Sequence, residues 1–178
     1  TKMPMKRIMS FIFALLISLL SFGSIQQQDI RYHNISMQDG LRSNAVRNIV
    51  QDKFGFIWLG TDNGLCRYDG INVHYYTILQ QGTDQFISAL QNTDNGLLVG
   101  TAHGAYLFDY KSETFIPFAK VIRKQINHFS SDADGNIWMA TMGQGVVRYN
   151  PKTKSSRLYH FTANKGNISE VFVDSRNQ

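Results

Sequence analysis

A repeat of 40 residues is the feature that most constrains how this chain can fold. Laying the sequence over itself aligns three segments and the beginning of a fourth, starting at Val46, Ile87, Ile126 and Ile168. Threonines recur at the spacing of the repeat, at Thr61, Thr101 and Thr141. A fixed period of this length is typical of proteins built from stacked supersecondary units, each of which needs its neighbours to bury its apolar face.

Each copy of the repeat has the pattern of four short strands. Short apolar runs alternate with Gly, Asn and Asp at turn positions, and Asp134-Gly135 favours the positive φ angles of a tight hairpin. No helical periodicity appears after the first 28 residues. Four strands in about 40 residues is the size of a propeller blade. The sequence therefore predicts an all-β fold, a β-propeller with four-stranded antiparallel blades, preceded by an N-terminal signal helix.

The copies also predict the domain organisation. We expect a partial propeller over 29–178, with blade 1 at 41–79, blade 2 at 83–119, blade 3 at 122–162 and the start of blade 4 at 167–178. Residues 30–37 have the pattern of the last strand of a blade, which predicts a closing strand that completes the sheet of the final blade. Propellers use about four to eight blades, so this sequence is expected to be the N-terminal fragment of a longer protein.

The first 28 residues have the layout of a secretory signal peptide. Lys6 and Arg7 precede an apolar stretch over 8–22, and small residues follow at Gly23 and Ser24. This stretch is short for a bilayer span, which needs roughly 20 residues. We therefore expect the segment 1–28 to be a signal peptide, with an uncleaved membrane anchor as the alternative.

Charge and cysteine content exclude some classes of partner. The net charge is +5, but from Asp29 onward 15 basic residues face 13 acidic ones, so a nucleic-acid partner is not expected. Cys66 is the single cysteine, so the chain has no intramolecular disulfide. Its apolar strand context predicts a buried, unreactive thiol.

The first copy resembles a known repeat. Its marks are Gly-Leu-x-Ser-Asn at 40–44, Asp52, Gly-x-x-Trp-x-Gly-Thr at 55–61 and Gly-Leu at 64–65. The run from Gly40 to Gly70 is similar to the two-component regulator propeller repeat. The later copies depart from the pattern, because the second has Leu98 in place of the Trp and the third has Ala140 in place of the Gly.

This resemblance implies a function in signalling. It implies the N-terminal, periplasmic sensor part of a hybrid two-component histidine kinase, whose parent protein is anchored in the inner membrane through a helix downstream of this chain. It further implies a small glycan ligand for the complete sensor and a homodimeric assembly. The kinase chemistry would belong to downstream modules, so this chain is not expected to be an enzyme.

Candidate ligand-binding residues follow from propeller topology. Loops that lead into the first strand of a copy should open on the same face as the turns between second and third strands. These segments supply Arg42, Asn44, Arg47, Asp62, Asn63 and His103. The alternative for the asparagines is a local role as turn formers. Trp58 and Trp138 are expected to pack between blades.

No cofactor or metal site is predicted, and no catalytic set of side chains stands out. Asp132, Asp134 and Asn136 have the outline of a calcium loop, but the distal bidentate carboxylate is missing, so a hairpin turn is the preferred interpretation. Two other functions stay open. One is an exported propeller enzyme such as a lyase or glycosidase, and the other is a binding scaffold without signalling.

Overall fold

The computed structural model describes residues 32–78 and 85–174. The chain divides into two compact units, 1–34 and 35–178. In the first unit the described residues, 32–34, belong to no helix or strand. The predicted signal helix in 1–28 lies outside the described residues. Within the part of the chain that is described, no helix is long and apolar enough to cross a membrane.

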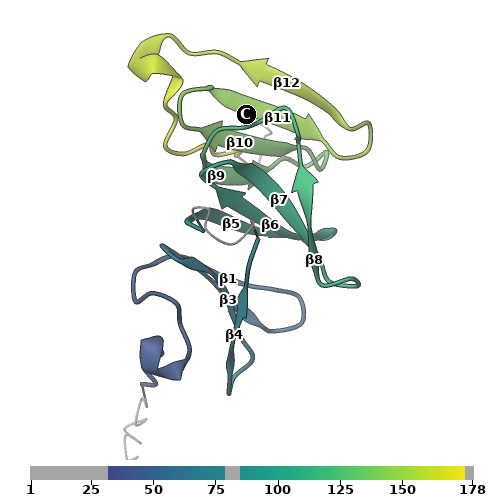
Figure 1. Cartoon of the computed structure of the whole chain (residues 1–178). Coiled ribbons are helices and arrows are strands. Elements are labelled where there is room, and N and C mark those ends of the chain that lie inside the picture. The colour runs from purple at the N-terminus through teal and green to yellow at the C-terminus, as the bar shows by residue number, and fades with distance from the viewer. Residues whose placement is uncertain (1–31, 79–84, 175–178) are drawn as a thin grey trace, which may run out of the picture. The chain divides into compact units, whose positions relative to one another are not determined.

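The second unit contains three antiparallel sheets of four strands each (Figure 1). The first sheet consists of β1 (Val46–Gln51), β2 (Ile57–Thr61), β3 (Gly64–Tyr68) and β4 (Val73–Tyr76). The second consists of β5 (Ile87–Thr93), β6 (Gly96–Thr101), β7 (Gly104–Asp109) and β8 (Thr114–Phe118). The third consists of β9 (Ile126–Ser131), β10 (Ile137–Thr141), β11 (Val146–Asn150) and β12 (Ser155–Tyr159). The predicted all-β fold, with a four-stranded antiparallel sheet for each of the first three copies, is confirmed.

Strands follow one another within each sheet in chain order, and the copies share one register. The first strand of each copy begins opposite the end of the second, in the pairs Val46–Thr61, Ile87–Thr101 and Ile126–Thr141. Between sheets, β1 lies against β5 and β5 lies against β9 (Figure 1). Contact between consecutive first strands is the arrangement of propeller blades, so we call the sheets blades 1, 2 and 3.

An aromatic cluster fills the space between blades 1 and 2. Trp58 of β2 is fully buried, and its ring centroid lies 4.9 Å from that of Phe108 in β7. Tyr76, Tyr110 and Phe115 pack around these two rings. The predicted packing role of Trp58 between blades is therefore confirmed.

The backbones of neighbouring blades approach closely where β2 and β6 carry glycine. A Cβ atom on Gly60 would lie 2.7 Å from Cγ2 of Ile87, and one on Gly100 would lie 2.9 Å from Cβ of Ile126. The isoleucines that begin β5 and β9 therefore pack directly against the glycine of the preceding blade. The equivalent position of blade 3 is Ala140, the departure noted in the third copy.

The fourth copy forms no strand in its described residues, 167–174. The segment runs beside β9 and is held by side chains of that strand. Asn127 donates from Nδ2 to the carbonyl of Ile168 at 2.8 Å, and Nδ1 of His128 lies 3.0 Å from the carbonyl of Val171. The contact with β9 is the contact that first strands make with one another in blades 1 to 3. The end of the predicted fourth blade, 175–178, lies outside the described residues.

The predicted closing strand at 30–37 is not formed over its described residues. Residues 32–36 belong to no strand, and Met37–Asp39 is a 3₁₀ turn that begins at Ser36. The turn forms because the backbone N–H of Ser36 donates to Asp39 Oδ2 at 2.8 Å, which completes a capping box. The strand was expected to pair with a final blade outside this sequence, so that pairing stays a prediction.

Candidate functional site

The predicted site residues lie at one end of the blades, which we call the leading-loop face. It comprises the segments before each first strand (42–45, 85–86 and 123–125), the first two residues of these strands, and the turns after each second strand (62–63, 102–103 and 142–144). The shared register brings these segments together, because every first strand begins opposite the threonine that ends the second strand.

That repeating threonine closes the turn in all three blades. Oγ1 of Thr61 donates to the carbonyl of Gly64 at 2.8 Å and accepts from the N–H of Asn63 at 3.1 Å. Thr101 makes the same two bonds with Gly104 and His103. Thr141 bonds the carbonyl of Gly145 and the N–H of Gln144. All three threonines are buried, so their recurrence reflects turn formation, a role that the spacing alone did not reveal.

Arg47 and Asp62 form the direct contact among the predicted residues. Nε of Arg47 donates to Oδ1 of Asp62 at 2.7 Å, and the Arg47 NH2 group donates to Oδ2 at 2.9 Å. The hydrogen bond from Arg47, together with its positive charge, lowers the pKa of the Asp62 carboxyl. The side chains are 56% and 38% exposed. Such an exposed pair adds little stability and is open to a ligand.

Arg42 and Asn44 lie on the same face but have different surroundings. The guanidinium of Arg42 stacks over the ring of Tyr75, with Cζ 4.2 Å from the ring centroid. The Asn44 side chain accepts a 2.9 Å hydrogen bond from the backbone N–H of Met37 through Oδ1. Asn44 thus holds the 3₁₀ turn in place, in agreement with the alternative that it serves local structure.

Asn63 and His103 occupy equivalent exposed positions in the turns of blades 1 and 2. Their backbone N–H groups bind the turn threonines, and the side chains extend from turns that are already held by these bonds. The structure therefore brings the six predicted residues to one end of blades 1 and 2, with a direct contact between Arg47 and Asp62.

Two aspartates in the turns at the opposite end were not expected to bind tryptophan. Asp52 Oδ2 accepts from Nε1 of Trp58 at 2.7 Å, while Oδ1 accepts from the N–H groups of Phe54 and Phe56. Asp132 accepts from Nε1 of Trp138 at 2.9 Å. The spacing of six residues between aspartate and tryptophan in both copies is the signal that could have revealed these pairs.

Asp132 also binds the amide of Asn136 within its hairpin turn. Burial raises the pKa of the Asp132 carboxyl, but hydrogen bonds from Trp138 and Asn136 outweigh it, and the pKa lies below its usual value. Both oxygens thus serve the turn and the indole. Among residues 32–78 and 85–174, no group of three His, Cys, Asp or Glu side chains is placed to hold a metal ion.

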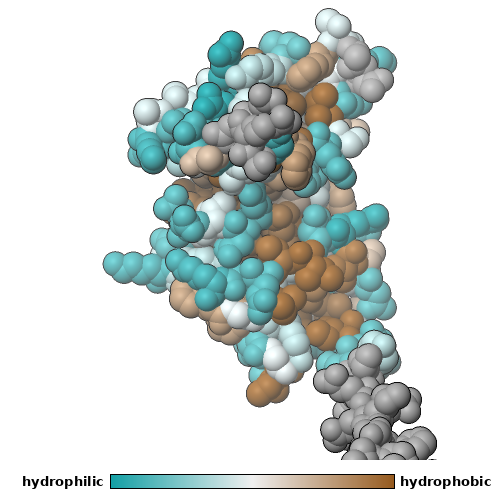
Figure 2. Space-filling model, turned by 180° about the vertical axis from the view of Figure 1, so that it is seen from behind, coloured by the Kyte–Doolittle hydropathy of each residue, from teal (hydrophilic) through white to brown (hydrophobic). Residues whose placement is uncertain are grey.

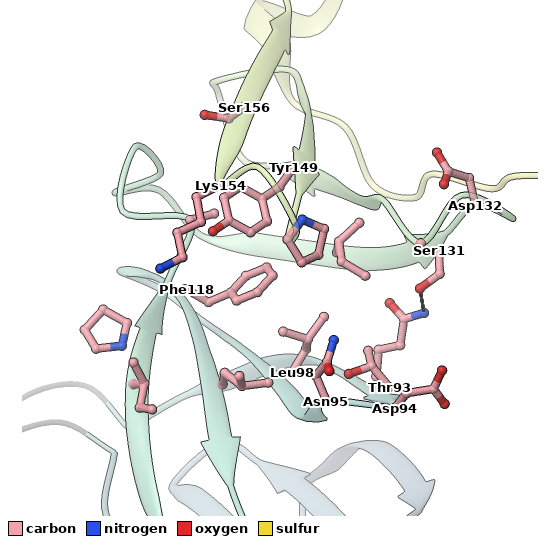
Figure 3. A pocket seen from close by; sticks show the side chains of 18 of the residues that line it. Thr93, Asp94, Asn95, Leu98, Phe118, Ser131, Asp132, Tyr149, Lys154 and Ser156 are labelled. Carbon is pink, nitrogen blue, oxygen red and sulfur yellow. Dashed lines mark hydrogen bonds between the residues drawn. The ribbon is translucent and has the colours of Figure 1, made fainter.

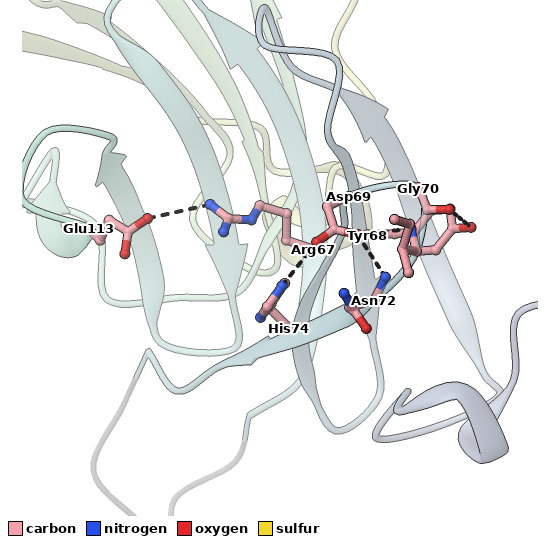
Figure 4. Close-up of polar contacts among 8 residues, drawn as sticks. Arg67, Tyr68, Asp69, Gly70, Asn72, His74 and Glu113 are labelled. Atoms are coloured by element: carbon pink, nitrogen blue, oxygen red, sulfur yellow. Dashed lines mark hydrogen bonds and ion pairs between the residues drawn. The ribbon is translucent and has the colours of Figure 1, made fainter.

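A second polar cluster lies on the β3–β4 turn of blade 1 (Figure 4). Asp69 Oδ1 accepts from the N–H groups of Asn72 and Ile71 at 2.7 and 2.9 Å. These backbone hydrogen bonds lower the pKa of Asp69 to about 2, with a smaller contribution from His74. Arg67 of the same blade lies 3.5 Å from Glu113 of blade 2. The cluster closes a turn and joins two blades.

Two family models match the chain. Residues 65–175 match the SMP-30/Gluconolactonase/LRE-like region. Residues 40–63 match the two component regulator propeller, and they lie within the run from Gly40 to Gly70 that carried the resemblance. The predicted two-component regulator propeller repeat is thereby confirmed.

A curated relative is histidine kinase P4 of Formosa agariphila, with 27% identity over 168 residues. The alignment covers 83% of this chain and 12% of that protein. The chain therefore spans about one eighth of the curated relative that it matches.

Solved structures share the fold. The extracellular domain of a hybrid two-component system from B. thetaiotaomicron matches with 21% identity and a TM-score of 0.65, over 71% of this chain and 20% of that chain. A second such domain from the same organism matches with 18% identity and a TM-score of 0.70, over 85% and 22%. A streptogramin B lyase matches with 11% identity and a TM-score of 0.60, over 78% and 48%. At these identities the likeness establishes the propeller fold.

Proposed function

Because the chain belongs to the SMP-30/gluconolactonase/LRE-like family and carries a two-component regulator propeller repeat, we propose that it is the N-terminal part of a sensor propeller of a hybrid histidine kinase. The observation that carries the proposal is the repeat at 40–63, joined to a histidine kinase relative along 83% of the chain. The propeller detects a ligand outside the cytoplasm, and the kinase chemistry resides in other parts of the protein.

The leading-loop face is the ligand-binding surface in this proposal. It offers a charged pair, Arg47 and Asp62, together with the stacked side chains of Arg42 and Tyr75. Planar groups and paired hydrogen-bond partners suit a polyhydroxylated ring, whose faces are apolar and whose rim is polar. A small glycan is therefore the proposed ligand class.

Further blades and a second protomer complete the assembly in this proposal. Figure 2 shows apolar side chains gathered on one face of the molecule. Separately, the side chain of Ile49 in β1 is 69% exposed and that of Phe172 in the fourth copy is 81% exposed. Exposed apolar surface of this kind favours contact with other protein surfaces. The proposed location is the periplasm, with the parent protein anchored in the inner membrane.

The proposal is tested by phosphorylation of the protein at its natural length in membrane vesicles. Autophosphorylation from labelled ATP is measured with and without a panel of oligosaccharides. We expect one member of the panel to change the rate, and the double variant Arg47→Ala/Asp62→Ala to require at least about tenfold more of it, because the charged donor and the charged acceptor that this face would offer to a ligand are both removed.

The matched control is Lys111→Ala, which alters an exposed residue of the β7–β8 turn at the other end of blade 2. This variant should respond as the unaltered protein does. A reading frame that continues without a membrane helix and kinase motifs would contradict the proposal and favour the exported enzyme or the non-signalling scaffold.

A further inference from the structure

A groove with a volume of about 1200 Å³ lies between blades 2 and 3 (Figure 3). Its apolar wall includes Leu98, Phe118 and Tyr149, and the rings of Phe118 and Tyr149 meet edge to face at 4.7 Å. Polar side chains from the ends of β5 and β9 and from the β5–β6 and β9–β10 turns line one end, among them Thr93 and Ser131, the last residues of their strands. These turns lie at the opposite end of the blades from the leading-loop face.

The groove exists because three aromatic positions of the first inter-blade space are small in the second. The strand pairings make Leu98 the equivalent of Trp58, since Val50 faces Trp58 and Gln91 faces Leu98. On the facing blade, Phe108 and Tyr149 are equivalent, so Tyr110 corresponds to Pro151 and Phe115 to Ser156. Indole, phenol and phenyl rings are thus replaced by a leucine, a proline and a serine.

The filled space between blades 1 and 2 indicates what the groove can hold. There the indole of Trp58 lies 4.9 Å from Phe108 and 6.4 Å from Tyr110, ring centroid to ring centroid. Its Nε1 donates to a carboxylate at 2.7 Å. In the groove Leu98 stands in place of that indole, while the equivalent of Phe108, Tyr149, is retained. The vacated space therefore suits a planar ring.

An acceptor without a donor among the described residues lies on the strand beside Leu98. Gln91 lies directly opposite Leu98 in the β5–β6 pair and lines the groove. Its Nε2 donates to Ser131 Oγ at 2.8 Å, whereas its Oε1 is buried and accepts no hydrogen bond from the described residues. A buried acceptor without a donor costs free energy, which a ligand N–H or O–H would recover.

The charges that line the groove balance. Lys120 and Lys154 carry positive charge, and Asp94 and Asp132 carry negative charge. A neutral ligand leaves this balance intact, whereas an ionic ligand would have to lose hydration without a matching excess of opposite charge.

We propose that the groove between blades 2 and 3 is a binding site for a neutral planar aromatic ring that carries an N–H donor, of the indole type. The ring occupies the space that Trp58 fills between blades 1 and 2, and its N–H donates to Gln91 Oε1. This inference does not depend on the proposed function, because none of the six candidate residues of the leading-loop face lines the groove.

The test measures indole binding to the protein at its natural length by isothermal titration calorimetry, with 1-methylindole as the probe that lacks the donor. We expect saturable binding of indole and about fivefold weaker binding of 1-methylindole, the loss of one hydrogen bond. Gln91→Leu should weaken indole binding by the same factor and leave 1-methylindole unchanged.

Leu98→Trp supplies the missing ring and should reduce indole binding by more than about tenfold. Ser156→Phe fills the groove from blade 3 and should reduce indole binding by the same factor. It keeps the test decisive if Leu98→Trp fails to fold. Ser155→Phe places the same ring on the neighbouring residue of β12, which does not line the groove, and should bind indole normally. Absence of saturable indole binding, or binding that both filling variants leave unchanged, would overturn the proposal.

Discussion

Nε1 of Trp58 donates a 2.7 Å hydrogen bond to Oδ2 of Asp52, six residues earlier in the same blade. The indole is fully buried and Asp52 is 5% exposed. The remaining carboxylate oxygen receives two backbone N–H groups of the β1–β2 turn. One aspartate thus fixes a hairpin turn and orients the largest side chain between blades 1 and 2.

Trp58→Phe should lower the free energy of unfolding by about 1–3 kcal/mol, because Asp52 loses a donor in a buried position. Urea denaturation followed by far-ultraviolet circular dichroism measures the change. Trp138→Phe is the matched variant, and its effect should be smaller, because Oδ2 of Asp132 also accepts from Asn136. Equal losses of unfolding free energy for the two variants would show that the hydrogen bond to Asp52 contributes no more to stability than the one to Asp132.

Gly60→Ala should destabilise the protein by about 1–3 kcal/mol, because the added methyl group would lie 2.7 Å from Cγ2 of Ile87. Gly100→Ala should act similarly against Ile126. The same denaturation assay applies, with Ala140→Gly as the control at the equivalent position, where removal of the methyl group should cost less than about 1 kcal/mol. A Gly60→Ala protein as stable as the parent would refute the close approach of the two blades.

Thr101→Val removes the hydroxyl that joins the backbone of His103 and Gly104 and should cost about 1–3 kcal/mol. Thr101→Ser keeps the hydroxyl and should cost less. Thermal melting of both variants distinguishes the hydrogen bonds from the packing of the methyl group. If the serine variant melts below the valine variant, packing and not the hydroxyl holds the turn.

The pKa of Asp69 should be about 2 when the carboxyl carbon is titrated by NMR, because the backbone N–H groups of Asn72 and Ile71 favour the charged form. A lowered folded-state pKa stabilises the protein above the pKa of the unfolded chain, about 3.9. This contribution is lost as the pH falls from about 4 towards 2.

Asp69→Asn should fold normally and remove this part of the acid sensitivity. Blade 3 already has the amide at the equivalent position, where Asn150 Oδ1 accepts from the N–H groups of Lys152 and Thr153. A variant that keeps the full acid sensitivity of the parent would assign it to other carboxylates.

Cys66 should react slowly with a thiol reagent in the folded protein and rapidly in urea. The side chain is fully buried in β3, and burial raises the pKa of its thiol. Both effects lower the concentration of accessible thiolate. Labelling at equal rates in the two conditions would contradict the burial of β3 between its neighbours.

The repeated strands could be predicted because each depends on local chemistry. Turn residues such as Asp134-Gly135 and the alternation of apolar runs act within a few positions, and the copies reinforce one another. The shared face of Arg47 and Asp62 also followed from topology, since it needs only the register of two paired strands. Their direct bidentate contact depends on side-chain geometry that the pattern of the sequence does not contain.

The groove could not be predicted from any single copy. Leu98 was visible as a departure from the repeat, but the space it leaves persists because Pro151 and Ser156, on another blade, are small as well. Its existence therefore depends on three residues up to 58 positions apart in the chain.

The 3₁₀ turn at Met37–Asp39 was missed for a local reason, because the Ser36–Asp39 capping box overrides the strand-like pattern before it.

Each turn contains two kinds of position: the threonine, whose hydroxyl holds the turn, and the residues that follow it, whose side chains extend from the turn. Because Thr61 and Thr101 hold their turns by bonding backbone groups, the turns do not require a particular side chain at positions 63 and 103. Asn63 and His103 already differ at the same place in two blades. Substitutions can therefore accumulate at these positions, and change the ligand specificity proposed for the leading-loop face, while the sheet behind them stays intact.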